Sequence, residues 1–114
     1  MGVSAESAQG FLQLVSDRVS IDTVHPGISS RGELLVTNTG SAPVWLTRVA
    51  TSCTCTDVDY DEEVVMPGDT LTLRVTYTTS RTMPGKVRQT IYINATGDNP
   101  RSVAFIEAEL VGGG

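Results

Sequence analysis

The stretch LTLRVTY at residues 71–77 alternates strictly between apolar and polar side chains. Successive side chains of an extended chain point to opposite sides, so the apolar residues share one face and the polar residues share the other. A strand with one dry and one wet face is typical of an antiparallel sheet that covers a core. The stretch therefore predicts a β-strand, with Leu71, Leu73, Val75 and Tyr77 facing inward and Thr72, Arg74 and Thr76 facing water.

Two later segments show the same two-residue period. Residues 87–94 (VRQTIYIN) and 104–110 (AFIEAEL) each alternate between an apolar and a polar side. The side chains expected to face the core are Val87, Gln89, Ile91 and Ile93 in the first segment, and Ala104, Ile106, Ala108 and Leu110 in the second. Those expected to face water are Arg88, Thr90, Tyr92 and Asn94, and Phe105, Glu107 and Glu109.

Turn signals separate segments of this kind along the whole chain. Asn38-Thr39-Gly40 and Pro67-Gly68-Asp69 contain residue types that preset or tolerate turn conformations. Short strands separated by such turns at roughly 8–12-residue spacing are typical of β-sandwiches. The sequence therefore predicts an all-β, immunoglobulin-like β-sandwich of seven or eight antiparallel strands, near 11–15, 18–23, 32–38, 43–50, 53–58, 70–78, 86–94 and 102–111.

A chain of 114 residues is long enough for one compact domain. We expect a mobile N-terminal segment over 1–10, a single sandwich domain over 11–111 and a glycine tail over 112–114. No signal peptide is evident at the start, so a secretion signal is absent or already removed, and a cytoplasmic location does not follow.

Charge and hydropathy exclude two classes of function. The net charge is −5, and the eight Lys and Arg residues are scattered singly, whereas nucleic-acid binding needs clustered basic residues. No apolar run reaches the about 18–20 residues that a membrane-spanning helix requires. We therefore expect neither a nucleic-acid partner nor a membrane span.

The segment 43–50 breaks its own alternation. Val44 and Leu46 share one face, and strict alternation places Val49 on the other. A bulge near Thr47-Arg48 would return Val49 to the Leu46 face, because one extra residue reverses the alternation. Two alternatives remain open for Trp45, which is either part of the core or an exposed aromatic side chain.

Cys53-Thr54-Cys55 is the segment with the clearest chemical capacity. On an extended strand both sulfurs would lie on the same side. Three interpretations stay open: two thiols that pack like small apolar side chains, a redox-active or strained disulfide, and a Cu(I) site held by two thiolates. A disulfide across so short a loop removes little entropy from the unfolded chain, so we do not expect a structural staple.

Asp57, Asp59 and Asp61 alternate in the way that a calcium loop begins. The full EF-hand pattern needs Gly at its sixth position and Glu at its twelfth, where this chain has Glu62 and Gly68. The pattern is therefore incomplete. A weak loop site for calcium at the three aspartates is the remaining hypothesis, against the alternative that they are solvated loop charges.

An ordered series of motifs carries a family resemblance. Asn38-Thr39-Gly40 is followed by Val44-Trp45-Leu46, by SCTCT at 52–56 and by Pro67-Gly68-Asp69. From about Phe11 to Val111 the chain resembles the bacterial domain-of-unknown-function family numbered fifteen seventy-three (DUF1573). In that family an Asn-Thr-Gly turn precedes a Ser-Cys-Gly-Cys-Thr motif and a Pro-Gly-Glu/Asp turn. One position departs from the pattern, because Thr54 stands where the family has Gly.

The resemblance implies a fold similar to Hydin-type and major-sperm-protein domains, with no assigned enzyme activity. It further implies an exported or envelope protein of bacteria, notably of Bacteroidetes. The expected location is the periplasm, the outer membrane or the outside of the cell, with other envelope proteins or neighbouring domains as partners.

We therefore expect a non-catalytic structural or protein-interaction module of the bacterial cell envelope, without a cofactor. Its contacts would use exposed strand edges near 11–15 or 102–111. Phe105 beside Val103 could form an exposed apolar strip, and the alternative is that Phe105 caps the core. The alternative is a Cu(I)-binding or redox-active thiol protein that uses Cys53 and Cys55. A third hypothesis is a carbohydrate- or peptide-binding sandwich with Trp45 and Tyr60 as stacking platforms. The oligomeric state is not predicted.

Overall fold

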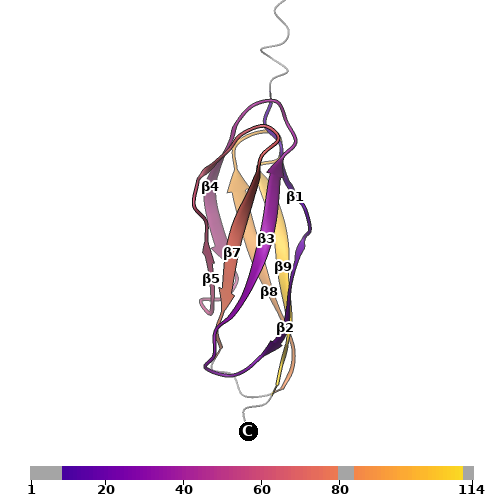
Figure 1. Ribbon diagram of the computed structural model, residues 1–114, viewed down its shortest axis with the longest axis vertical. Coiled ribbons are helices and arrows are strands. Elements are labelled where there is room, and N and C mark those ends of the chain that lie inside the picture. Colours follow the sequence, from indigo (N-terminus) through magenta and orange to yellow (C-terminus); the bar gives the residue numbers. More distant parts are fainter. Residues whose placement is uncertain (1–8, 80–83, 112–114) are drawn as a thin grey trace, which may run out of the picture.

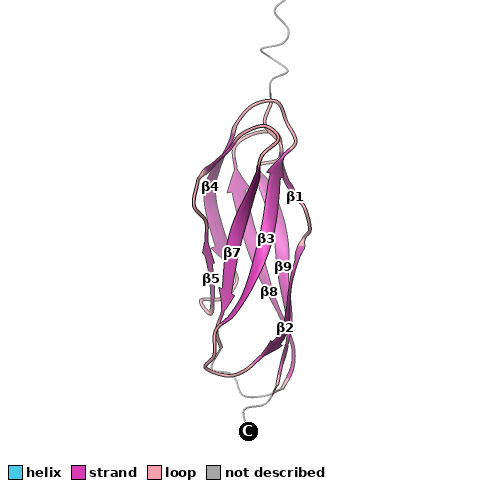
Figure 2. Cartoon of the chain, in the orientation of Figure 1, coloured by secondary structure: helices cyan, strands magenta, loops and turns pink. Residues whose placement is uncertain are grey.

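The computed structural model describes residues 9–79 and 84–111, which form strands, turns and loops without any helix (Figure 2). Most of the segment 1–10 and all of the tail 112–114 lie outside these described residues. Within the described part of the chain, no helix is long and apolar enough to cross a membrane. The strands are β1 (Leu12–Leu14), β2 (Arg18–Val24), β3 (Ser30–Asn38), β4 (Val44–Thr51), β5 (Thr56–Asp59), β6 (Val64–Val65), β7 (Thr70–Tyr77), β8 (Gly85–Ala95) and β9 (Arg101–Leu110).

The strands form two sheets that stack face to face (Figure 1). One sheet has four strands in the order β1-β3-β7-β5, and the other has five in the order β2-β9-β8-β4-β6. This arrangement confirms the predicted immunoglobulin-like sandwich. The described residues form nine strands rather than seven or eight, because β6 has only two residues and is too short for alternation to reveal.

One pair of strands does not follow the expected antiparallel pattern. β2 runs parallel to β9, with Arg18 opposite Phe105 and Val24 opposite Leu110. Alternation shows which side of a strand is buried but carries no information on strand direction, so the sequence could not reveal this pairing. The chain passes from β1 in one sheet to β2 in the other, and β2 joins the C-terminal strand instead of its neighbour in sequence.

The core lies between the sheets and is built by the inward residues of the alternating strands. Leu73 and Val75 of β7 are fully buried, as are Ile91 and Ile93 of β8 and Ile106 of β9. The predicted dry faces of these three strands are therefore confirmed. Burial of an aliphatic side chain stabilises the fold by about 1.5–3 kcal/mol, so these faces are the main reason why the two sheets stay together.

The predicted bulge in the segment 43–50 is confirmed. The register of β4 against β8 shifts between Leu46 and Arg48, which leaves Thr47 as the extra residue. Val49 consequently packs against the core on the same side as Leu46. Trp45 precedes the bulge on the opposite side, and 49% of its surface is exposed.

The predicted strand 53–58 is wrong in its first half. β5 begins only at Thr56, and the segment from Ser52 to Cys55 is a turn between the sheets. The N–H of Thr56 donates to the carbonyl of Cys53 over 3.2 Å, which closes the turn. An extended segment between the two cysteines would separate their Cα atoms by about 6.7 Å, whereas the observed separation is 5.2 Å.

The Asn-Thr-Gly and Pro-Gly-Asp turns meet at one end of the sandwich, where the side chain of Asn38 is completely buried. Its oxygen accepts hydrogen bonds from the N–H groups of Phe11 and Gly40, and its nitrogen donates to the carbonyls of Ala42 and Val65. Every hydrogen-bonding position of this amide is thereby used.

The backbone of Asn38 completes the junction. Its N–H donates to the carbonyl of Asp69 over 3.1 Å, and its carbonyl accepts from Gly68 over 2.8 Å. Gly68 has a φ of +83°, a conformation that favours glycine. The two turn motifs are therefore parts of one structural unit, which explains why they occur together.

Candidate functional site

Cys53 and Cys55 form a disulfide in the β4–β5 turn. Both cysteines are half-buried and Thr54 between them is exposed. The carbonyl of Cys53 accepts from the hydroxyl of Thr51 over 2.8 Å, and the carbonyl of Cys55 accepts from the N–H of Thr78 over 2.9 Å. Of the three interpretations of this segment, the structure therefore has the disulfide.

The turn around the cysteines does not need glycine. No described residue other than glycine has a positive φ, so Thr54 fits the turn with an ordinary backbone conformation. With the two sulfurs bonded to each other, neither is a thiolate. Reduction must therefore precede any binding of Cu(I) at this pair.

Two of the three candidate calcium ligands already have a cationic partner. Arg74 of β7 donates to Asp59 over 2.8 Å and to both carboxylate oxygens of Asp61 over 2.9 and 3.3 Å. The hydrogen bonds and positive charge of Arg74 lower the pKa of Asp61. The described residues contain no group of three or more His, Cys, Asp or Glu side chains that could hold a metal ion. A calcium site at Asp57, Asp59 and Asp61 stays a prediction.

The strand edges offer little room for another strand. The edge strands of the two sheets are β1 and β5, and β2 and β6. β1 and β6 have three and two residues, β5 carries Asp57 and Asp59, and β2 has a register shift between Ile21 and Thr23. Short strands, charges and bulges are the means by which proteins protect edges. The expected edge at 102–111 is wrong, because β9 lies between β2 and β8.

The outer face of the five-stranded sheet exposes aromatic and aliphatic side chains in neighbouring positions. Tyr92 of β8 is directly opposite Val103 of β9 and Ala50 of β4. Tyr92 and Val103 are 46% and 43% exposed. Residues that lie opposite one another on neighbouring strands form a row across the sheet. In the next row on this face, two residues along β9 from Val103, Phe105 is half-buried. We call this surface, completed by Trp45 at the far end of β4, the aromatic face.

Arg88 explains why Phe105 is only partly exposed. Its guanidinium carbon lies 4.1 Å from the centre of the Phe105 ring, a cation–π contact. Arg88 also lies 3.9 Å from Glu107, which in turn accepts a hydrogen bond from Arg18 over 3.4 Å. Phe105 thus belongs to the outer surface and does not cap the core, which Ala104 and Ile106 on either side of it enter.

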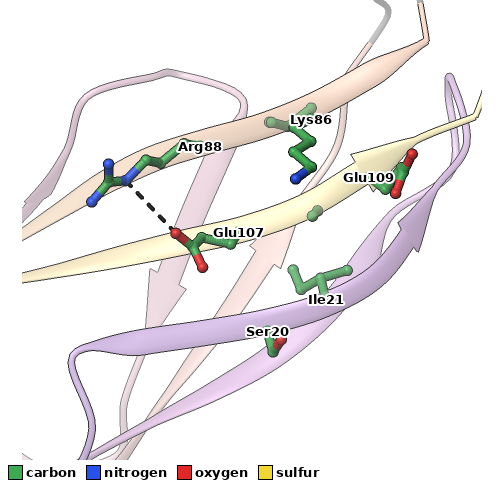
Figure 3. Close-up of a pocket in the computed structure, with 8 residues that line it drawn as sticks. Ser20, Ile21, Lys86, Arg88, Glu107 and Glu109 are labelled. Atoms are coloured by element: carbon green, nitrogen blue, oxygen red, sulfur yellow. Dashed lines mark ion pairs between the residues drawn. The ribbon is translucent and has the colours of Figure 1, made fainter.

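A shallow depression of about 400 Å³ lies at the other end of the aromatic face, across β2, β9 and β8 (Figure 3). Figure 3 shows Lys86 and Arg88 on β8 beside Glu109 and Glu107 on β9, with Ser20 and Ile21 of β2 in front. The depression is lined by charges of both signs, two of which pair with each other. It therefore lacks the convergent polar groups and apolar wall of a small-molecule site.

The structure brings some predicted site residues together and separates others. Trp45 and Phe105 lie on the aromatic face, whereas Tyr60 follows β5 of the other sheet and packs against the core. Tyr92 was not among the predicted site residues. Its signal was available, because the alternation places this aromatic side chain on a face expected to contact water.

The comparisons with known proteins identify a family and a fold. A family model described as "Protein of unknown function (DUF1573)" matches residues 12–110. A protein of unknown function from Porphyromonas gingivalis W83 has a similar structure, with a TM-score of 0.77 and 20% identity over 91% of this chain. The match covers 49% of the Porphyromonas chain, so this sequence spans about half of that protein. No curated protein matches the sequence.

Two further solved structures share the fold at low sequence identity. The ASH/PapD-like domain 7 of human CEP192 has a TM-score of 0.72 and 9% identity, over 90% of this chain and 87% of that one. The periplasmic chaperone SfaE has a TM-score of 0.62 and 17% identity, over 91% of this chain and 58% of that one. These similarities show that the sandwich has the same fold as these two domains.

Proposed function

We propose, from the premise that this chain belongs to the DUF1573 family, that it is a non-catalytic protein-interaction module of the bacterial cell envelope. The observation that carries the proposal is the group of exposed apolar side chains on the aromatic face. Tyr92 and Val103 face water in adjacent positions of two central strands. The core does not need them, because the residues next to them in sequence, such as Ile91, Ile93 and Ala104, already point into it. Aromatic side chains in such a position supply rigid contact area at low entropic cost.

The aromatic face is a better interaction surface than the strand edges. Its strands β8 and β9 have eleven and ten residues, are paired on both sides and hold their side chains in fixed rows. The edges of the sandwich are short, charged or irregular. A partner would therefore dock against side chains, and it would not extend the sheet by adding a strand.

The envelope location is supported by the cysteines and by the family resemblance. A Cys53–Cys55 disulfide persists in the oxidising periplasm or outside the cell and is rare in the reducing cytosol. Alkylation of intact cells before lysis should leave both cysteines of the native protein unlabelled. Labelling of both thiols without prior reduction would contradict the envelope location.

The interaction itself can be tested by photo-crosslinking from the two sides of the sandwich. A photoreactive amino acid at position 103 samples the aromatic face, and one at position 35 is the matched control. Leu35 and Val103 are similarly exposed, at 38% and 43%, but belong to strands of different sheets. A discrete adduct should form in cells from position 103 and not from position 35. No adduct from position 103, or the same adducts from both positions, would contradict the proposed function.

The disulfide favours a second candidate function, a redox-active dithiol. Its loop encloses a single residue, both cysteines are half-exposed, and it lies in a turn rather than in the core. Two molecules of glutathione would reduce it to two thiols, with formation of one glutathione disulfide. Complete reduction of the folded protein in a cytosol-like glutathione buffer, with re-oxidation in an oxidising one, supports this candidate. A disulfide that glutathione reduces only after unfolding argues against it.

A further inference from the structure

We infer that the aromatic face recognises an extended acidic polypeptide segment in which a carboxylate side chain is flanked, two residues to either side, by apolar side chains. This inference rests on the proposed function and names the chemistry of the partner. It follows from the distribution of charge on the face, from the order of its rows and from two arginines that form no ion pair with any described residue.

Basic residues are concentrated on the aromatic face although the chain is acidic overall. The sequence has eight Lys and Arg residues and a net charge of −5. One of the eight, Arg81, lies outside the described residues. Five of the others lie on the outer side of the five-stranded sheet, where the described side chains of its strands include two acidic ones, Glu107 and Glu109. The five are Arg18 of β2, Arg48 of β4, Lys86 and Arg88 of β8, and Arg101 of β9.

Two of these arginines are available for a partner. Arg18 and Arg88 are engaged by Glu107, and Arg88 also covers Phe105. Arg48 and Arg101 are exposed, and neither forms an ion pair within the described part of the chain. Arginine binds carboxylates through paired, planar hydrogen bonds, so these two side chains favour a carboxylate ligand.

The free arginines occupy one row between two apolar rows. Arg48 is opposite Asn94, and Asn94 is opposite Arg101, so the three residues form a row across β4, β8 and β9. The row of Ala50, Tyr92 and Val103 lies two residues further along the strands. On the other side of the arginine row, beyond the bulge, Trp45 pairs with Val64.

The spacing of these rows matches an extended ligand. Alternate side chains of an extended chain are about 6.8 Å apart, and the arginine row and the Tyr92 row are separated by the same two-residue step of β8 and β9. A segment that lies along the strands can therefore place its carboxylate at Arg48 and Arg101. The side chains two residues before and after that carboxylate then contact Trp45 and the Tyr92–Val103 pair.

A polyanion fits the face less well than discrete carboxylates do. In the rows beyond Phe105, Glu107 engages Arg18 and Arg88, and Glu109 stands opposite Lys86. These rows therefore offer no continuous track of uncompensated positive charge to a phosphate backbone or an anionic membrane. A second copy of the chain also fits poorly. Its acidic segment DVDYD at 57–61 alternates acidic with apolar residues, so three carboxylates share one side. Asp59 and Asp61 of that segment are already bound to Arg74.

The experiment uses a fluorescein-labelled peptide of sequence Ser-Thr-Phe-Thr-Glu-Thr-Leu-Thr-Ser and the full chain, with binding followed by anisotropy. Replacement of Glu by Gln in the peptide should weaken binding by about tenfold, because a charge-assisted hydrogen bond is lost. Arg101→Glu should weaken binding by at least as much. Arg31→Glu is the matched control: Arg31 is exposed on β3 of the other sheet, and its substitution should leave affinity within twofold.

Each other outcome overturns the inference. Equal affinity for the Glu and Gln peptides, equal effects of Arg101→Glu and Arg31→Glu, or tighter binding of a single-stranded oligonucleotide or of phosphatidylglycerol vesicles would each contradict it. Concentration-dependent self-association that Arg101→Glu abolishes would assign the face to a second copy instead. These outcomes contradict only the inferred ligand, because the proposed function is tested separately by the crosslink from position 103. Absence of that crosslink contradicts the proposed function, whether or not the peptide binds.

Discussion

The side-chain amide of Asn38 donates a hydrogen bond of 2.9 Å to the backbone carbonyl of Val65. Asn38 ends β3 of the four-stranded sheet, and Val65 belongs to β6 of the five-stranded sheet. This bond therefore joins the two layers of the sandwich at the end where the Asn-Thr-Gly and Pro-Gly-Asp turns meet. The two bonded residues are 27 positions apart in sequence, and Val65 lies just before the Pro-Gly-Asp turn.

Replacement of Asn38 by alanine should lower the free energy of unfolding by about 3 kcal/mol, because buried backbone groups lose their partners. Chemical denaturation measures the change. Asn94→Ala is the control: Asn94 is half-buried on the outer face, and its replacement should cost less than about 0.5 kcal/mol. Equal losses in the two variants would show that the Asn38 junction does not stabilise the fold.

Two adjacent leucines of β3 provide a test of the sandwich itself. Leu34 is 1% exposed in the core and Leu35 is 38% exposed on the outer face. Leu34→Ala should lower the free energy of unfolding by about 2–5 kcal/mol, since it leaves a cavity, and Leu35→Ala by less than about 1 kcal/mol. Denaturant midpoints of the two variants make the comparison. A reversed order would mean that β3 presents its other face to the core.

The disulfide should contribute little to stability. It closes a loop of only three residues, for which the unfolded-state entropy model gives about 1.5 kcal/mol. We therefore expect reduction, or the double change Cys53→Ser and Cys55→Ser, to lower the free energy of unfolding by no more than that. Denaturation with and without a thiol reductant measures it, and a loss above about 3 kcal/mol would show that the turn depends on this bond.

The ion pair between Asp61 and Arg74 should affect stability only in acid. Hydrogen bonds from Arg74 and its charge lower the pKa of Asp61 below the ordinary value of 3.8. The stabilisation is therefore fully present above about pH 3.8 and is lost as the pH falls through the lowered pKa of the folded state. Because both groups are at the surface, salt should weaken the effect.

An NMR titration of the Asp61 carboxyl carbon checks this expectation. Arg74→Gln should raise the pKa of Asp61 toward 3.8. Arg31→Gln changes the same charge on the neighbouring strand β3 and should leave that pKa nearly unchanged. A pKa of Asp61 that is insensitive to Arg74→Gln would show that the pair does not persist in solution.

The alternation of residues 71–77, 87–94 and 104–110 was sufficient to predict which side of these three strands faces the core. The physical reason is local: the pleat of a strand fixes the direction of each side chain once the residue order is known. The same local rule predicted the bulge in β4, because Val49 could reach the core only with an extra residue before it.

Other features depend on contacts that no local pattern encodes. The two-residue strand β6 exists because β4 provides a partner for it. The cysteines lie in a turn because the chain crosses between the sheets at this point, although their spacing also fits a strand. In the same way, Trp45 is exposed because Val44 and Leu46 on either side of it point into the core, an orientation that its own sequence neighbourhood left open.

The sequence by itself determined the class of fold, the buried side of its most regular strands and the family, since each depends on the order of residue types along the chain. Only the tertiary structure decided that Arg48, Arg101, Tyr92 and Val103 share one surface. Those residues come from three strands whose side-by-side arrangement and register are set by long-range hydrogen bonds. The surface that we propose for binding is therefore a property of strand pairing, which the linear order of residues does not contain.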